Sequence, residues 1–119
     1  MKRFLLSILI SVLLCSHAIA AGPTIDEANY IQFTAADQET DVVFYIYAIA
    51  WVEDDAANTD IAADDDMTLE DGSGTVIISK RGAAAGDELI VTFPFPILAS
   101  GLKAEDLDGG ILYVYGKRK

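Results

Sequence analysis

The chain has 119 residues, of which 52% are hydrophobic, and its formal net charge at pH 7 is −11. This length allows one domain, and the apolar content excludes a chain that is disordered throughout. So acidic a surface repels phosphate groups, which excludes non-specific binding to nucleic acid and to anionic lipid headgroups.

Residues 1–20 have the pattern of a secretory signal peptide, expected as an N-terminal signal helix. Lys2 and Arg3 are followed by an apolar core and by Ala18-Ile19-Ala20, a small-residue cleavage pattern. We expect cleavage before Ala21; the alternative is an uncleaved membrane anchor, because about 17 residues can just span a bilayer. The mature protein is therefore expected to be secreted, periplasmic or on the extracellular surface, with no membrane contact after cleavage.

Loss of the signal removes the reactive side chains. Cys15 and His17 are the single cysteine and histidine, and six basic residues then remain against 19 acidic ones, a net charge of −13. The mature domain has no disulfide, thiol nucleophile or imidazole base, which excludes Ser-His-Asp and Cys-His catalysis and His-based zinc sites. Paired carboxylates need a cleft, which a domain of about 99 residues rarely forms beside its core. We predict that the protein is not an enzyme.

The longest apolar run is Val42–Val52, with the sequence VVFYIYAIAWV. β-Branched and aromatic residues dominate it, and it is too short to span a bilayer, so we predict a strand. With a period of two, Tyr45, Tyr47 and Trp51 share one face. Both faces are apolar, so the strand should be covered on both sides, or covered on one and used for contact on the other.

The other predicted elements are short and separated by turns. They are a strand at Tyr30–Thr34, a hairpin at Met67–Ser79, a strand at Glu88–Phe93, a proline-containing edge segment (FPFPI), a short element at Leu102–Leu107, and a final strand at Ile111–Tyr115 before a basic tail. This spacing is typical of all-β folds. Alternation along Glu88–Phe93 predicts that Leu89, Val91 and Phe93 point inward and that Ile90 and Thr92 point outward. We predict one domain at residues 21–119, a small antiparallel β-sandwich or jelly-roll-like barrel.

Residues 53–66 are strongly acidic, with six Asp and one Glu. Such runs are usually solvated loops, and a helical turn around Ala56–Ala63 is the local alternative. The cluster also offers enough oxygens for Ca²⁺, although the spacing does not match an EF-hand loop. The candidate calcium ligands are Asp54, Asp60, Asp64, Asp65 and Asp66. No other cofactor is expected.

Aromatic residues gather on two predicted strands. Tyr113 and Tyr115 share a face of the last strand, as Tyr45, Tyr47 and Trp51 do on the long one. Neighbouring strands would produce an aromatic ladder. Such a ladder has three possible roles: ordinary cross-strand packing, a contact surface for another protein, or a platform that binds carbohydrate.

One family resemblance lies in the C-terminal quarter, FPFPILASGLKAEDLDGGILYVY. An apolar-proline segment (Pro96-Ile97), a Gly101-Leu102 turn, Leu107, a turn at Gly110 and a final Tyr113-Val114-Tyr115 strand carry it. The stretch resembles small β-sandwich proteins of phage particles, which implies a sandwich fold and a virion-associated structural role. A signal peptide is not expected in that family, so the identity of the larger structure that this protein would join is left open.

We therefore expect an exported, non-catalytic structural protein that self-assembles or docks on a larger cell-surface or virion structure through a protein partner. The alternative is a small extracellular module that binds a glycan or calcium.

Overall fold

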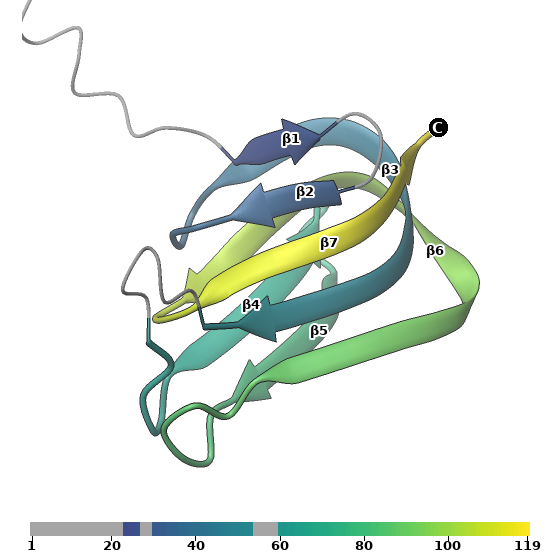
Figure 1. The fold of residues 1–119 in the computed structure, drawn as a ribbon. Helices are drawn as coiled ribbons and strands as arrows, with labels where there is room; N and C mark the ends of the chain where they lie inside the picture. Colours follow the sequence, from purple (N-terminus) through teal and green to yellow (C-terminus); the bar gives the residue numbers. More distant parts are fainter. Residues whose placement is uncertain (1–22, 27–29, 54–59) are drawn as a thin grey trace, which may run out of the picture.

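The computed structural model describes residues 23–26, 30–53 and 60–119, and every regular element among them is a β-strand (Figure 1). The strands are β1 (Thr24–Asp26), β2 (Tyr30–Phe33), β3 (Glu39–Val52), β4 (Asp66–Asp71), β5 (Val76–Arg81), β6 (Leu89–Leu107) and β7 (Ile111–Arg118). The expected signal helix and its cleavage site lie outside the described residues, as does the first half of the helical turn expected at Ala56–Ala63; the described half, residues 60–63, is not helical.

No helix in these three described ranges is long and apolar enough to cross a membrane.

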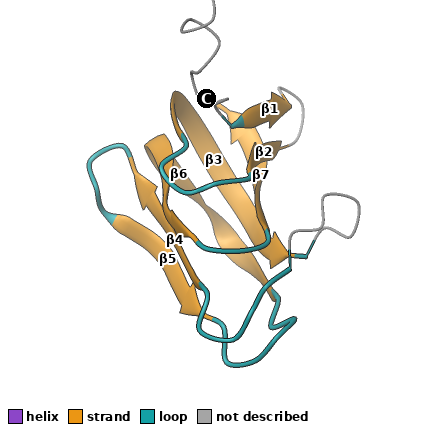
Figure 2. Ribbon diagram, turned by 90° about the vertical axis from the view of Figure 1, so that its left-hand side faces the viewer, coloured by secondary structure: helices purple, strands orange, loops and turns teal. Residues whose placement is uncertain are grey.

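The seven strands form a single sheet in the order β1-β2-β7-β3-β6-β4-β5, and every neighbouring pair is antiparallel. The predicted all-β, antiparallel class is confirmed. The sheet is strongly bent, and Figure 2 shows the β4–β5 end lying opposite the end formed by β1, β2 and β7. The long run that the sequence singled out is the core of β3, the middle strand.

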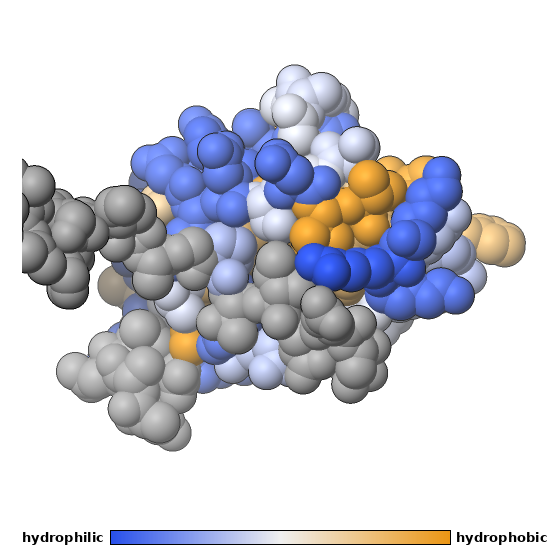
Figure 3. Space-filling model, turned by 90° about the horizontal axis from the view of Figure 1, so that it is seen from above, coloured by the Kyte–Doolittle hydropathy of each residue, from blue (hydrophilic) through white to orange (hydrophobic). Residues whose placement is uncertain are grey.

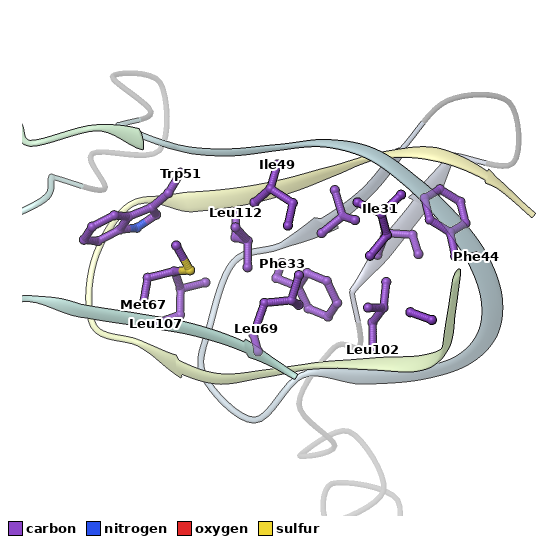
Figure 4. Packing of buried hydrophobic residues seen from close by; sticks show 14 of the residues in the cluster. Ile31, Phe33, Phe44, Ile49, Trp51, Met67, Leu69, Leu102, Leu107 and Leu112 are labelled. Atoms are coloured by element: carbon purple, nitrogen blue, oxygen red, sulfur yellow. The ribbon is translucent and has the colours of Figure 1, made fainter. Parts of the chain in front are cut away.

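The hydrophobic core fills the concave side of the bent sheet. Trp51, Ile49 and Leu112 project from β3 and β7 toward Met67 and Leu69 of β4 (Figure 4). All five side chains are fully buried. The Trp51 ring is fixed as well as buried, because its Nε1–H donates a hydrogen bond of 2.8 Å to the Gly109 carbonyl. A buried indole usually needs such a partner.

A β-bulge at Tyr47 divides β3 into two halves. Ile46 lies opposite Gly116 of β7 and Ala48 lies opposite Tyr115, so Tyr47 has no partner on that side. The extra residue reverses the alternation: Phe44 and Ile46 point into the core before it, and Ile49 and Trp51 after it. The prediction that Tyr45, Tyr47 and Trp51 share one face is therefore wrong.

The two prolines of β6 lie at this same place. Ile97 pairs with Ile46 and Thr92 pairs with Ala48, so the four residues between them lie opposite Tyr47 alone. Proline has no N–H to donate, which fits a stretch outside regular pairing. The proline segment does lie at an edge of the sheet, as predicted, because β4 pairs with the other side of β6 only from Leu102 onward. The strand does not end there, however, and the short element expected at Leu102–Leu107 is its continuation.

The predicted hairpin is confirmed as β4 and β5, with a turn that its glycines permit. Gly74 has a φ of 83°, which favours glycine, whereas Gly72 is needed for space. A Cβ on Gly72 would collide with the Ser100 carbonyl oxygen of β6. The Asp71 carboxylate accepts hydrogen bonds from the backbone N–H groups of Ser73 and Thr75, both at 2.9 Å. This side chain holds the turn closed.

The last strand is longer than predicted. β7 pairs with β3 as far as Arg118, so most of the expected basic tail belongs to the sheet. Gly116 permits this, because a Cβ there would collide with the Tyr45 carbonyl oxygen. β2 pairs with the other side of β7, and β1, which the sequence did not predict, pairs with β2.

Candidate functional site

The convex side of the sheet carries apolar and aromatic residues that the core does not use. Residues directly opposite each other on antiparallel strands share a face, so the strand pairs identify this surface. We call it the outer face. Its large members are Tyr30, Tyr45, Tyr47, Ile90, Leu98, Tyr113 and Tyr115.

Small residues form the middle of the outer face. Ala50 of β3 lies between Tyr113 of β7 and Ile90 of β6, and Ala48 lies between Tyr115 and Thr92. The side chains of β6 and β7 therefore stand on either side of a strip of alanines. Ile90 is 70% exposed and Tyr115 is 40% exposed.

A second group of the outer face lies beyond the bulge. Tyr45 pairs with Leu98 on one side and with Lys117 on the other. Tyr47 is 41% exposed at the bulge itself, and Phe95, from the proline segment opposite it, is 80% exposed. Exposed large side chains thus follow β3 and its neighbours over most of their length. Single exposed apolar residues are normal on a protein surface, whereas a contiguous group of them requires an explanation.

Three tyrosines pack together on the outer face. Tyr113 and Tyr115 are stacked with centroids 6.0 Å apart, and Tyr30 meets Tyr113 edge-on at 5.6 Å. The Gln32 amide donates a hydrogen bond of 3.2 Å to the Tyr113 hydroxyl. These ring geometries are the favourable ones for aromatic pairs, so the cluster is pre-ordered before any partner binds.

The five predicted interface residues divide between the two sides of the sheet. Tyr45, Tyr47, Tyr113 and Tyr115 lie on the outer face, whereas Trp51 is fully buried in the core. The expected ladder between β3 and β7 does not form, because alanines of β3 lie opposite Tyr113 and Tyr115.

Sequence reasoning missed Tyr30, Ile90 and Leu98 as members of this surface. Tyr30 meets the last strand only through the β2–β7 pairing, 85 positions away, and no local pattern encodes that contact. Ile90 had a signal: it alternates with Leu89 and Val91, and an outward position was predicted for it.

The predicted calcium ligands are spread through a loop and a strand start, and Asp54 lies outside the described residues. Asp65 accepts a hydrogen bond of 2.7 Å from the Ala62 N–H, and Asp64 pairs with Arg81 at 3.2 Å. Among the described residues, no group of three or more His, Cys, Asp or Glu side chains is arranged to hold a metal ion. These carboxylates organise the loop, and calcium binding there stays a prediction.

Ion pairs and hydrogen bonds shift three titrating groups. The Ser73 hydroxyl and the backbone N–H groups of the turn lower the pKa of Asp71. Hydrogen bonds from Lys80 and from the Ala83 N–H lower the pKa of Asp87. Carboxylates on both sides raise the pKa of Lys103, Glu105 more than Asp37. Each is a stabilising contact at a turn or strand end.

Two surface depressions lie near the strand ends. One of about 340 Å³ is lined by residues of the β4–β5 turn and by acidic residues of β3 and β4, including Glu39, Asp41 and Glu70. The other, of about 590 Å³, lies where β7 ends beside the start of β3.

Comparison with protein-family models, curated proteins and solved structures finds no match for this chain.

Proposed function

We propose that this is an exported, non-catalytic structural protein that works by association, through the outer face, with further copies of itself or with a larger cell-surface or virion structure. The proposal includes a β-sandwich-like body, which is supported by the buried side chains between the two ends of the bent sheet. Export is supported by the sequence of residues 1–20 alone.

One observation carries the proposal: aromatic and aliphatic side chains remain exposed along β7, β3 and β6 in a chain that is otherwise strongly acidic. Tyrosine is enriched at the centre of protein interfaces, and charge is depleted there. The outer face matches both tendencies, because the charged residues paired with its large members, Asp26 opposite Tyr30 and Lys117 opposite Tyr45, lie away from the strip of alanines at its centre. Exposing this surface to water without a partner would be unfavourable.

Sedimentation velocity of the mature protein tests the proposal. We expect concentration-dependent oligomers that disappear in Ile90→Asp, because a carboxylate in the contact surface loses its hydration. Val76→Asp is the matched control: Val76 is also exposed, at 52%, but it lies on β5, outside the outer face. Equal association of Ile90→Asp and wild type would contradict the role of the outer face.

The alternative is a glycan-binding module. The three-tyrosine cluster and the Gln32 amide place polar groups beside aromatic rings, as carbohydrate sites do. A monomer that shows a specific response on a glycan array, lost in Tyr115→Ala, would favour this alternative over association.

A further inference from the structure

The sheet has a free edge on β6, in addition to the edges formed by its two outermost strands, β1 and β5. Residues Leu89–Thr92 pair with β3 on one side, but β4 pairs with the other side of β6 only at Leu102–Leu107. In an antiparallel strand, the N–H and C=O groups of successive residues point alternately to the two sides. About half of the backbone groups of Leu89–Phe93 therefore face a side on which no described strand pairs. We call this stretch the β6 edge; it runs along the lower border of the sheet in Figure 1.

The β6 edge lacks the charged side chains that the other two free edges carry. β1 ends at Asp26, and β5 ends with Lys80 and Arg81. Charges on an edge strand oppose pairing with another chain. From Leu89 to Gly101, in contrast, the chain has no charged residue. Seen from above, hydrophobic surface gathers toward the end of the molecule at which β6 turns (Figure 3). An uncharged edge rich in β-branched and aromatic residues is suited to pairing with a further strand.

The hydrophobic core is not fully covered along the β6 edge. Leu89 packs against the core but is only partly buried, whereas Trp51, directly opposite it on β3, is fully buried. Val91 and its β3 partner Ile49 differ in the same way. Burial thus decreases from β3 to β6, toward the open side. A further strand at this edge would remove more of Leu89, Val91 and Phe93 from water, which is favourable.

The β6 edge is complementary to a second copy of itself. Glu88 precedes it, and Pro94, which has no N–H to donate, follows it, so Val91 is the middle of the stretch that can pair. Antiparallel pairing about Val91 places Leu89 opposite Phe93 of the second copy, and Ile90 opposite Thr92. Residues that lie directly opposite each other share a face.

This register satisfies that condition. Leu89 and Phe93 both pack against the core, and Ile90 and Thr92 are both exposed on the other side. A register shifted by one residue would place an inward side chain opposite an outward one. The edge therefore specifies a single symmetric arrangement over its full length.

The same register keeps the acidic residue at the start of β6 away from its counterpart. Glu88 of one copy lies opposite Pro94 of the other, so the two Glu88 side chains are separated by about 20 Å at 3.3 Å per residue. Charges this far apart are largely screened, because the screening length is about 8 Å at physiological ionic strength. Two copies of a strongly acidic chain can therefore approach along this uncharged edge.

We propose that the β6 edge pairs antiparallel with the β6 edge of a second copy of this chain, about a two-fold axis at Val91. The proposal rests on the proposed function and specifies its partner and geometry. The axis is perpendicular to the sheet, so the outer faces of the two copies lie on the same side and form one continuous surface. A two-fold contact of identical surfaces closes at two chains, so a larger assembly requires a second contact through the outer face.

Disulfide cross-linking tests the register. Directly opposite residues of an antiparallel pair have Cα atoms about 4.5–5.5 Å apart, within reach of a disulfide. We expect Val91→Cys, in a chain that also carries Cys15→Ser, to form a covalent dimer under mild oxidation.

Ile90→Cys in the same Cys15→Ser chain is the matched control. The two Ile90 positions would lie diagonally across the axis, about 7–8 Å apart, which is too far for a disulfide. We expect at least a tenfold lower yield of covalent dimer, although Ile90 is the more exposed residue. Equal yields from the two variants, or no covalent dimer of Val91→Cys in protein that has associated, would overturn the proposed register.

Backbone hydrogen exchange of the wild-type chain tests the pairing without a substitution in the edge. We expect the amides of alternate residues in Leu89–Phe93 to exchange about tenfold more slowly when nine-tenths of the protein is associated, because exchange then comes from the unpaired remainder. The amides of β5, which is also a free edge, should not change. Association that leaves all amides of the β6 edge unprotected would overturn edge pairing.

The outcomes also separate this inference from the proposed function. Association that is lost in Tyr115→Asp, with no protection of the β6 edge in the wild type, would overturn edge pairing and keep the outer face as the interface. Dimers of Tyr115→Asp with a protected β6 edge would support edge pairing and contradict the outer face as the first contact. Wild-type protein that stays monomeric to ~1 mM would overturn a second copy as the partner, since contacts weaker than this hold little protein together.

Discussion

The two faces of this one sheet differ in what they bury and in what they leave exposed. On β3, Ile46 points into the core and is fully buried, whereas Tyr47 beside it is 41% exposed. On β6, Val91 lies half-buried against β3 while Ile90 next to it is almost free in solvent. Both faces are apolar, yet the concave one closes on itself and the convex one does not. Hydrophobicity alone therefore does not say which face stabilises the fold and which meets a partner.

The largest effect should come from placing one carboxylate on each face. We expect Ile46→Asp to abolish folding, because a buried carboxylate without a partner costs several kcal/mol out of a total of about 5–15 kcal/mol. Ile90→Asp should fold with nearly the wild-type melting temperature, since its side chain is 70% exposed. Circular dichroism melts of both variants check this. A cooperatively melting Ile46→Asp would show that the concave face is not the core.

The bulge that reverses which residues of β3 point to each face should be the next most sensitive point. A Cβ on Gly116 would meet the Tyr45 carbonyl oxygen and the Phe44 ring. We expect Gly116→Val to lower the free energy of unfolding in urea by about 3 kcal/mol, as other overpacked sites do. Gly86→Val serves for comparison, because nothing lies closer than 3.7 Å to a Cβ there, although its φ of 75° adds backbone strain. If Gly116→Val costs no more than Gly86→Val, the close approach of β7 and β3 is not required.

The smallest effect should be the pH dependence of the β4–β5 turn, which contributes to neither face. Hydrogen bonds lower the pKa of Asp71 in the folded state, so its contribution to stability is present above the unfolded value of about 3.9 and is lost as pH falls through the lower folded value. Asp71→Asn should therefore be less stable than wild type at pH 7, with the difference shrinking below about pH 4.

The matched control for the turn is Asp106→Asn, because the Asp106 carboxylate accepts no hydrogen bond from the described residues. Urea unfolding at pH 7 and pH 3 compares the two variants with wild type. A stability difference for Asp71→Asn that does not change with pH would show that the ionised carboxylate does not hold the turn.

Local patterns predicted much of this fold. β3, the β4–β5 hairpin, and the outward position of Ile90 follow from apolar periodicity and turn residues within a few positions. The bulge was not predictable, because an extra residue becomes visible only when Tyr115 and Gly116 of β7 are placed against Ala48 and Ile46. A change of one residue in register exchanges the two faces of a strand.

The candidate site was predicted in part for the same reason. The tyrosines of β3 and β7 stood out by composition, but Trp51 moved to the core when the bulge reversed the alternation. Tyr30 joined the surface through a strand pairing that no local signal marks. The continuity of β6 past its prolines was also missed, because proline excludes pairing only at its own N–H. Long-range pairing thus decided which aromatic residues reach the outer face.

Hydroxyl-radical footprinting of dilute and concentrated protein tests the central claim most directly, because it reports which side chains an association covers. If the outer face is the contact surface, oxidation of Tyr47, Leu98 and Tyr115 should fall as the protein concentration rises, while oxidation of Val76 on β5 should stay constant. Protection of Val76, or unchanged oxidation of all three outer-face residues in protein that has associated, would contradict it.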